Sequence, residues 1–197
     1  MGFQIESGVD VQPRSPEGSV HGRFQPFHLE HFEYVMEAKK RCDFLWIGIT
    51  RFDVAAPGIT RLGTHRDEPE NNPLTYYERV KTITMSLDDA GVARNEYAFV
   101  PFPIETPASL KGFLPTTVRC FTTICEDWNR KKIAVLEGAG YVVQVLWERD
   151  KKITGTDVRN LLAAGDERWR DLVPPGTARA LAEFDIADRL RQLRAVP

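Results

Sequence analysis

Apolar residues follow two different periods that alternate along this chain. Residues 20–24 have the pattern of a strand, and residues 28–40 carry apolar side chains at the three- and four-residue spacing of an amphipathic helix. Residues 44–50 then form an almost unbroken apolar run, which is typical of a strand that is buried on both faces. The order strand, helix, strand predicts a βαβ unit.

The same alternation continues through the middle of the chain. Three further strands are predicted, at residues 97–102, 116–123 and 141–147. Thr75 and Glu78 have the spacing of a capping box, which predicts the start of a helix. Another helix is predicted over residues 129–139, and Gly140 is expected to end it in the left-handed conformation.

The last part of the chain, residues 157–196, is helical in pattern and is interrupted at Gly165 and at Pro174-Pro175. Strands that alternate with helices form right-handed crossovers, which give a parallel sheet that binds ligands at the carboxyl ends of its strands. We therefore expect an α/β fold. Its expected form is a Rossmann-like, mostly parallel sheet with helices on both faces, in a single domain with C-terminal helices.

Composition limits the number of domains and the kinds of partner. With 197 residues, of which 42% are hydrophobic, the chain can build one full-sized core, so we expect one domain over residues 19–197. Residues 1–18 have no sustained period and are expected to form a flexible arm. The 26 basic and 28 acidic residues nearly cancel, so neither nucleic acid nor a membrane is an expected partner.

Two further features bear on location and metal content. No apolar run is long enough to span a bilayer and the first residues lack the pattern of a signal peptide, so we expect a cytoplasmic protein. The three cysteines, Cys42, Cys120 and Cys125, are odd in number and lack the ligand spacing of a zinc site. We expect them to be reduced, and we predict no protein metal site.

The strongest chemical signal is the segment Gly22-Arg23-Phe24-Gln25-Pro26-Phe27-His28-Leu29-Glu30-His31. It lies where the first predicted strand leads into the first helix, and the unpaired N–H groups and dipole of a helix start favour an anion. His28 and His31 are three residues apart, so both imidazoles can point at one phosphate chain. Gly22 lets the backbone approach closely, and Arg23 adds a positive charge. The segment predicts a phosphate-binding site.

This first segment resembles the GRFQPFHxGH signature of the nucleotidyltransferase superfamily, in particular that of the nicotinamide-mononucleotide adenylyltransferases. His28 and His31 match the family's HxxH pair, whereas Glu30 replaces the glycine before the second histidine. A second segment resembles the family's other signature, an Ile-Ser-x-Thr-x-Ile/Val-Arg stretch that opens a helix: Ile153-Thr154-Gly155-Thr156-Asp157-Val158-Arg159. The two segments occur in the family's order, and the resemblance covers most of the chain.

The resemblance implies that the two segments clasp a nucleoside triphosphate while a phosphate of the acceptor attacks the α-phosphorus and pyrophosphate leaves. It implies catalytic roles for His28, His31 and Arg159, with Arg159 and Arg23 neutralising the pyrophosphate. The residues it implies for nucleotide binding are Gly22, Arg23, Phe24, Thr154, Thr156 and Arg159. Mg²⁺ would bridge phosphate oxygens and be held mainly by the nucleotide. Family members often assemble symmetrically, which leaves a homo-oligomer open.

The acceptor site is less well marked. Residues 51–72 interrupt the alternation, and long segments of this kind are usually lids or binding loops. We expect acceptor contacts from Arg61 and Arg66 in this loop, from Arg79, and from Trp128, whose ring suits a flat cationic ring or a base. Two alternatives are equally open: pairing of Arg79 with Glu78 or another nearby acid, and simple packing of Trp128.

The leading functional hypothesis is transfer of AMP from ATP to nicotinamide mononucleotide, which gives NAD and pyrophosphate. Residues 103–112, which correspond to the family's acceptor segment, hold no tryptophan. That keeps a second hypothesis open, cytidylyl or adenylyl transfer to another phosphorylated acceptor: a phosphosugar, phosphoalcohol, phosphonate or phosphopantetheine. A third is a non-catalytic nucleotide-binding module, against which both histidines and Arg159 argue.

Overall fold

The computed structural model describes residues 14–52 and 68–195, and its centre is a five-stranded sheet. Neighbouring strands pair in parallel, in the order β3-β2-β1-β4-β5. The strands are β1 (Ser15–Gly22), β2 (Cys42–Ile49), β3 (Tyr97–Pro101), β4 (Arg119–Ile124) and β5 (Val143–Glu148). The strand order reverses between β1 and β4, which makes this pair the switch point at which open α/β sheets bind ligands.

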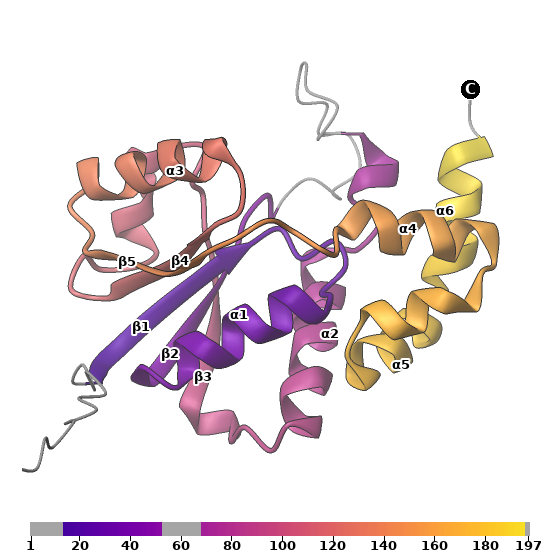
Figure 1. Ribbon diagram of the computed structural model, residues 1–197, viewed down its shortest axis with the longest axis horizontal. Coiled ribbons are helices and arrows are strands. Elements are labelled where there is room, and N and C mark those ends of the chain that lie inside the picture. Colours follow the sequence, from indigo (N-terminus) through magenta and orange to yellow (C-terminus); the bar gives the residue numbers. More distant parts are fainter. Residues whose placement is uncertain (1–13, 53–67, 196–197) are drawn as a thin grey trace, which may run out of the picture.

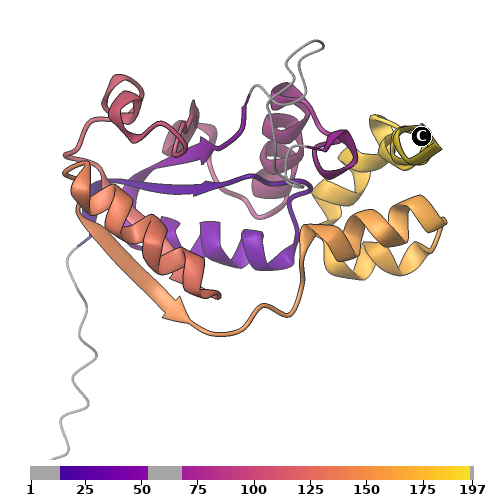
Figure 2. The ribbon, with the colours of Figure 1, turned by 90° about the horizontal axis from the view of Figure 1, so that it is seen from above.

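Helices cover both faces of the sheet. They are α1 (Leu29–Lys39), α2 (Tyr76–Asp89), α3 (Asp127–Gly138), α4 (Gly155–Ala164), α5 (Pro175–Glu183) and α6 (Ile186–Ala195). Short 3₁₀ helices are η2 (Pro69–Asn71), η3 (Arg94–Glu96), η4 (Pro107–Gly112) and η5 (Glu167–Leu172). Helices α1 and α2 lie against one face and α3 against the other, whereas α4, α5 and α6 gather beside the sheet (Figure 1, Figure 2). The expected α/β fold is confirmed.

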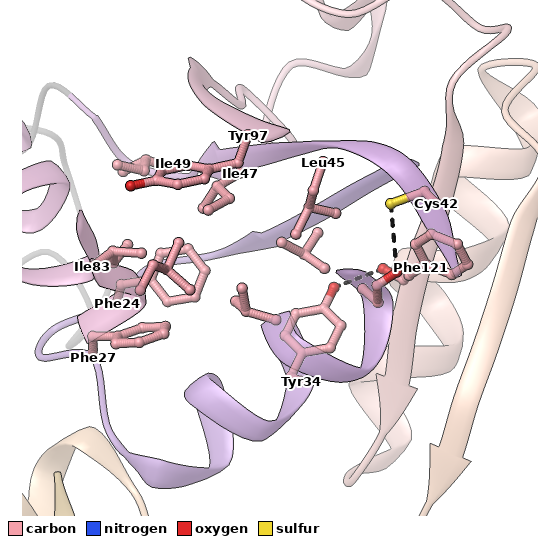
Figure 3. Packing of buried hydrophobic residues seen from close by; sticks show 14 residues of the cluster. Phe24, Phe27, Tyr34, Cys42, Leu45, Ile47, Ile49, Ile83, Tyr97 and Phe121 are labelled. Atoms are coloured by element: carbon pink, nitrogen blue, oxygen red, sulfur yellow. Dashed lines mark hydrogen bonds between the residues drawn. The ribbon is translucent and has the colours of Figure 1, made fainter. Parts of the chain in front are cut away.

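Side-chain alternation along the strands explains the two layers. Leu45 and Ile47 of β2 pack in one hydrophobic cluster with Tyr34 of α1 (Figure 3). On the opposite face, Cys120 of β4 packs with Leu136 of α3 in a second cluster. Successive side chains of a strand point to opposite faces, so β2, β4 and β5 each contribute to both clusters.

The first strand begins at Ser15 rather than at residue 20, so residues 15–18 belong to the sheet and not to the expected arm. None of these four residues has a large buried apolar side chain: Pro16 and Glu17 are exposed, Ser15 is half-buried and Gly18 is buried. Backbone pairing holds them instead: β1 pairs with β2 from Ser15 onward, and the N–H of Ser15 donates to the carbonyl of Arg41 at 2.8 Å. Such pairing leaves no hydrophobic period, which is why the apolar pattern alone places the start too late.

The expected helix breaks are present, and there is one more. Gly140 and Gly165 have left-handed φ values of 93° and 69°, and Pro174 immediately precedes α5. The tail also turns at Asp185, with φ of 50°, between α5 and α6. Aspartate tolerates the left-handed conformation but is far less distinctive of it than glycine, so the composition gives no clear signal there.

The C-terminal helices dock through α5 onto α2. The hydroxyl oxygens of Ser86 and Thr177 lie 2.9 Å apart, and both residues are buried. At Gly176, in the first turn of α5, a Cβ atom would lie 2.4 Å from the backbone carbonyl carbon of Met85. The two helices therefore meet at a distance that only glycine allows at this position.

We predict that Gly176→Ala lowers the free energy of unfolding by about 1–3 kcal/mol, because the added methyl group must push α5 away from α2. Gly138→Ala is the matched control. It lies in the exposed last turn of α3 with nothing within 4 Å of its Cβ position, so its stability should be unchanged or higher by about 0.5–1 kcal/mol. Urea unfolding followed by circular dichroism measures both, and equal stabilities of the two variants would contradict the packing argument.

Candidate functional site

Aromatic side chains hold the segment between β1 and α1 in place. Phe24 and Phe27 are fully buried, and Phe24 turns the chain with a left-handed φ of 52°. The ring of His31 lies edge-on to Phe24 and stacks on Phe27, with centroid distances of 5.0 and 6.0 Å. A Cβ at Gly22 would lie 2.7 Å from the Phe24 ring. Phe24 therefore supports the site from within the core, rather than contacting a nucleotide as expected.

His28 and His31 face each other at the start of α1. Their rings are stacked with centroids 3.6 Å apart, and Nδ1 of His31 accepts a long hydrogen bond of 3.5 Å from the backbone N–H of His28. His28 is the N-cap residue of α1 and is 5% exposed. Its Nδ1 atom has no hydrogen-bond partner among the described residues. The structure thus brings the two histidines together, as their spacing predicts.

Burial keeps both imidazoles neutral at physiological pH. It lowers the pKa of His28 to about 3, and the cationic Lys151 acts in the same direction while Asp157 opposes it. Burial also lowers the pKa of His31 well below its usual value, with further contributions from His28 and Lys151. A bound polyanion would raise both pKa values, because it stabilises the protonated rings. The pair is therefore uncharged until an anion arrives.

The second segment forms the start of α4. Oγ1 of its N-cap residue, Thr154, accepts a hydrogen bond from the N–H of Asp157 at 3.2 Å. The Asp157 carboxylate accepts in return from the N–H and the hydroxyl of Thr154, at 2.8 and 2.7 Å. The hydroxyl of Thr156 accepts from Arg159 at 3.1 Å. The expected threonine-capped helix start is present, but both hydroxyls are engaged within α4.

Arg159 joins the two segments from inside the protein. Its side chain is 1% exposed, and it donates to the carbonyl of Gln25 at 2.7 Å and to the side-chain oxygen of Asn71 at 2.6 Å. Burial lowers its pKa to about 10, so it stays charged at neutral pH. A Cβ at Gly155 would lie 2.6 Å from the Gln25 carbonyl oxygen, so α4 starts unusually close to the first segment. Contact of Arg159 with pyrophosphate stays a prediction.

Glu30, the departure from the family signature, is a second tie between the segments. Its carboxylate oxygens accept from the backbone N–H groups of Lys152 and Ile153, at 3.1 and 3.3 Å. One turn further along α1, Glu33 pairs with Arg149, which like Lys152 and Ile153 lies in the connection between β5 and α4. These carboxylates hold the starts of α1 and α4 side by side (Figure 2).

Arg79 does not take the expected acceptor-binding position. It is fully buried, and its guanidinium donates to the carbonyls of Arg23, Thr50 and Arg51 at 3.0, 2.8 and 3.0 Å. These carbonyls follow the ends of β1 and β2. The alternative of a pair with Glu78 is also wrong, because that carboxylate binds an arginine of α6. Arg79 therefore fixes the loops that leave the two strands.

Two lysines that sequence reasoning missed lie beside Trp128, which is 37% exposed in the first turn of α3. The ammonium nitrogens of Lys132 and Lys151 are 5.2 and 5.8 Å from the centre of its ring. Burial, with the repulsion of Lys151, lowers the pKa of Lys132 to about 8. The carboxylate of Glu126 accepts a hydrogen bond from Nε1 of Trp128 and pairs with Lys151 at 2.6 Å. No carboxylate among the described residues acts on the pKa of Lys132, so the side of the ring that Lys132 covers suits an anion better than a cationic base. Isolated lysines carry no periodic or capping signal that could have revealed them.

The remaining expected acceptor residues, Arg61 and Arg66, lie outside the described residues. Within residues 14–52 and 68–195, no three His, Cys, Asp or Glu side chains are grouped so that they could hold a metal ion. In the same part of the chain, no helix has the length and apolar character needed to cross a membrane.

No protein-family model matches the chain. Among curated proteins, it is 38% identical to phosphonoformate cytidylyltransferase from Streptomyces viridochromogenes, over 88% of this chain and 95% of that protein. It is 29% identical to nicotinamide-nucleotide adenylyltransferase from Ignicoccus hospitalis, over 87% of this chain and 94% of that protein.

Solved structures share the fold. A bifunctional NMN adenylyltransferase/ADP-ribose pyrophosphatase from Francisella tularensis matches 91% of this chain with a TM-score of 0.64 and 17% identity; this chain spans only 52% of that longer protein. A putative nicotinate-nucleotide adenylyltransferase from Vibrio parahaemolyticus matches with a TM-score of 0.55 and 16% identity, over 88% of this chain and 95% of that one. Since the sequence relationship at 38% identity spans nearly both chains, this protein belongs to the nucleotidyltransferase family that includes phosphonoformate cytidylyltransferase and the nicotinamide-nucleotide adenylyltransferases, and it is an enzyme of nucleotidyl transfer.

Proposed function

We propose that this enzyme transfers CMP from CTP to a small phosphonate acceptor and releases pyrophosphate. The observation that carries the proposal is the 38% identity with phosphonoformate cytidylyltransferase along nearly the full length of both proteins. The nicotinamide-nucleotide adenylyltransferases are more distant, at 25 to 29% identity. The proposal replaces the preference for ATP and nicotinamide mononucleotide that the sequence motifs alone favoured.

The second candidate is AMP transfer to nicotinamide mononucleotide. It is supported by several relatives that carry the name nicotinamide-nucleotide adenylyltransferase. Against it stands Lys132 beside Trp128, because the nicotinamide ring of that acceptor is itself a cation. The absence of tryptophan from residues 103–112 points the same way.

We assign the triphosphate to the paired starts of α1 and α4. Both helix starts direct N–H groups and the positive end of the helix dipole outward, which favours phosphate. His28 and His31 lie at the first of them, and Lys151 is close enough to affect the pKa of both imidazoles. Neutral imidazoles can each donate one N–H to a phosphate oxygen. We assign Arg159 a positioning role, since its guanidinium holds the Gln25 carbonyl of the first segment.

In the proposed reaction, an oxygen of the acceptor's phosphonate attacks the α-phosphorus of CTP. The bond between the α-phosphorus and the oxygen that bridges to the β-phosphorus breaks, and pyrophosphate leaves with that oxygen. No covalent bond to the protein is needed, so the enzyme contributes alignment of the two substrates and stabilisation of developing charge.

A divalent cation fits this scheme, and we propose Mg²⁺. The Francisella tularensis protein is described as complexed with AMP and a manganese ion. Because the described residues of this chain include no group of three metal-ligating side chains, we propose that phosphate oxygens hold most of the ion's coordination sphere. We further propose a cytoplasmic location, where nucleoside triphosphates are available.

A substrate panel tests the proposal. Pyrophosphate release is measured with Mg²⁺ and each of four nucleoside triphosphates, with phosphonoformate, nicotinamide mononucleotide or no acceptor. We expect CTP with phosphonoformate to exceed every other pair by about 10-fold or more in kcat/KM. A clear preference for ATP with nicotinamide mononucleotide would establish the second candidate instead, and nucleotide binding without release in any combination would favour a non-catalytic module.

Replacing His31 tests the role of the histidine pair. We predict that His31→Ala lowers turnover about 100-fold or more, because one preorganised donor to the developing charge is lost. Folding should be little affected, which a thermal melt checks. Unchanged turnover, or loss of the fold, would remove His31 from the proposed role.

Replacing Glu30 tests the tie between the two helix starts. We predict that Glu30→Ala raises the KM for CTP by about 10-fold, because α4 is no longer held against α1. This is the size of effect expected from the loss of hydrogen bonds to a charged group. Glu30→Gln retains one accepting oxygen, so its KM for CTP should lie between those of the wild-type enzyme and Glu30→Ala. Glu37→Ala is the control: it also breaks ion pairs of α1, with Lys40 and Arg41, but none with the connection to α4. A normal KM for CTP in Glu30→Ala would refute the tie.

A further inference from the structure

The pairing of β1 with β4 stops before both strands end. The last residues in register are Ser19 and Cys120. Beyond them the hydroxyl of Tyr34, from α1, accepts a hydrogen bond from the N–H of His21 at 3.2 Å. The same hydroxyl donates a hydrogen bond to the carbonyl of Phe121 at 2.6 Å (Figure 3). At the switch point of the sheet, the two strands are therefore joined through a side chain instead of directly.

Three polar atoms near these ends of β1 and β4 are buried without a hydrogen-bond partner among the described residues. They are both ring nitrogens of His21 and the hydroxyl of Thr122, and these residues are 4% and 0% exposed. Ser19 contacts Cys120 side chain to side chain, at 3.3 Å, so two residues further on His21 and Thr122 share that same face. The His21 ring is held flat on Phe102, with centroids 4.5 Å and planes 5° apart.

Such atoms call for an explanation. Nearly all buried polar side-chain atoms in native proteins have a partner, and exceptions cluster where a ligand, an ion or water completes the hydrogen bonding. Two adjacent residues with three unpaired atoms, at the carboxyl ends of two central strands, satisfy that description. His21 also lies directly before Gly22, where the expected phosphate-binding segment begins.

The charge that faces these atoms is positive. Lys132 of α3 is near enough to lower the pKa of His21, in addition to the larger effect of burial. The groups that act on Lys132 itself are Lys151 and the thiols of Cys120 and Cys125. Among the described residues, no carboxylate contributes to either shift. An ammonium group, an imidazole and a hydroxyl without an opposing acid are donors suited to an oxyanion.

We propose that His21, Thr122 and Lys132 bind an oxyanion of the acceptor, next to the phosphonate that reacts. The proposal rests on the proposed function and adds the part of the acceptor that is recognised. Phosphonoformate has this shape, because its carboxylate is bonded directly to the phosphonate phosphorus. Nicotinamide mononucleotide would present a cationic ring to Lys132, so these residues favour short acceptors with two anionic groups.

His21→Phe is the most informative variant, because the phenyl ring keeps the stack on Phe102 and removes only the two nitrogens. Calorimetry measures the affinity of this variant for phosphonoformate and for methylphosphonate, which lacks the carboxylate. Each titration is run with and without an unreactive CTP analogue, in which a methylene group joins the α- and β-phosphorus atoms. We expect the affinity for phosphonoformate to fall about 10-fold or more, while that for methylphosphonate changes by less than about 2-fold. The KM for CTP should not rise, and the melting temperature should not fall.

Thr122→Val is a second, isosteric variant with the same expected result, and Thr123→Val, on the other face of β4, is its control. Three results would overturn the site. They are an unchanged affinity for phosphonoformate in both folded variants, an equal loss of affinity for the two phosphonates, and no binding of either phosphonate to the wild-type protein. If the wild-type enzyme releases no pyrophosphate with any acceptor, the proposed function fails. His21-dependent binding of phosphonoformate would then still support the site.

Discussion

Two guanidinium groups shielded from water determine where the loops of the active site lie. A buried cation is stable only when oxygen atoms replace its lost hydration, so its surroundings have little freedom to move. Arg79 obtains these oxygens from the carbonyls that follow β1 and β2, and Arg159 from the carbonyl of Gln25 and the amide of Asn71. All of these partners lie outside regular helices and strands or at their ends, so the arginines order chain segments that lack the backbone pairing of a helix or a sheet.

The histidine pair and the acids around it form a consistent electrostatic arrangement. Two charged imidazoles with centroids 3.6 Å apart would repel each other, and burial removes that repulsion by keeping both neutral. The carboxylates of Glu30 and Asp157 are turned to backbone N–H groups at the start of α4. They stabilise the helix start while their charge is offset by hydrogen bonds. The acids near the candidate site are thus engaged in hydrogen bonds and do not oppose the anion that we propose to bind there.

Local sequence patterns were sufficient for the fold class, for the helix caps at Thr75 and Thr154, and for the pairing of His28 with His31. They failed where tertiary contacts decide the direction of a side chain. A cationic side chain near a predicted phosphate site suggests a contact with the ligand, yet Arg79 is fully buried and binds three backbone carbonyls. The proposed site at His21 could not be found from the sequence. It depends on the pairing of Ser19 with Cys120, two residues before His21 and Thr122, and that pairing is a property of the assembled sheet.

The contacts between the two helix starts also determine when a functional site can exist during folding. Glu30 and Ile153 are separated by 123 residues, and Gln25 and Arg159 by 134. Closing loops of this length costs chain entropy before any new contact compensates for it, so such contacts form late. A growing polypeptide carries the conspicuous histidine signature from an early stage of synthesis, but it acquires the complementary half only after synthesis has passed Arg159. A product that ends before Thr154 would therefore retain the recognisable signature without the second half of the candidate site.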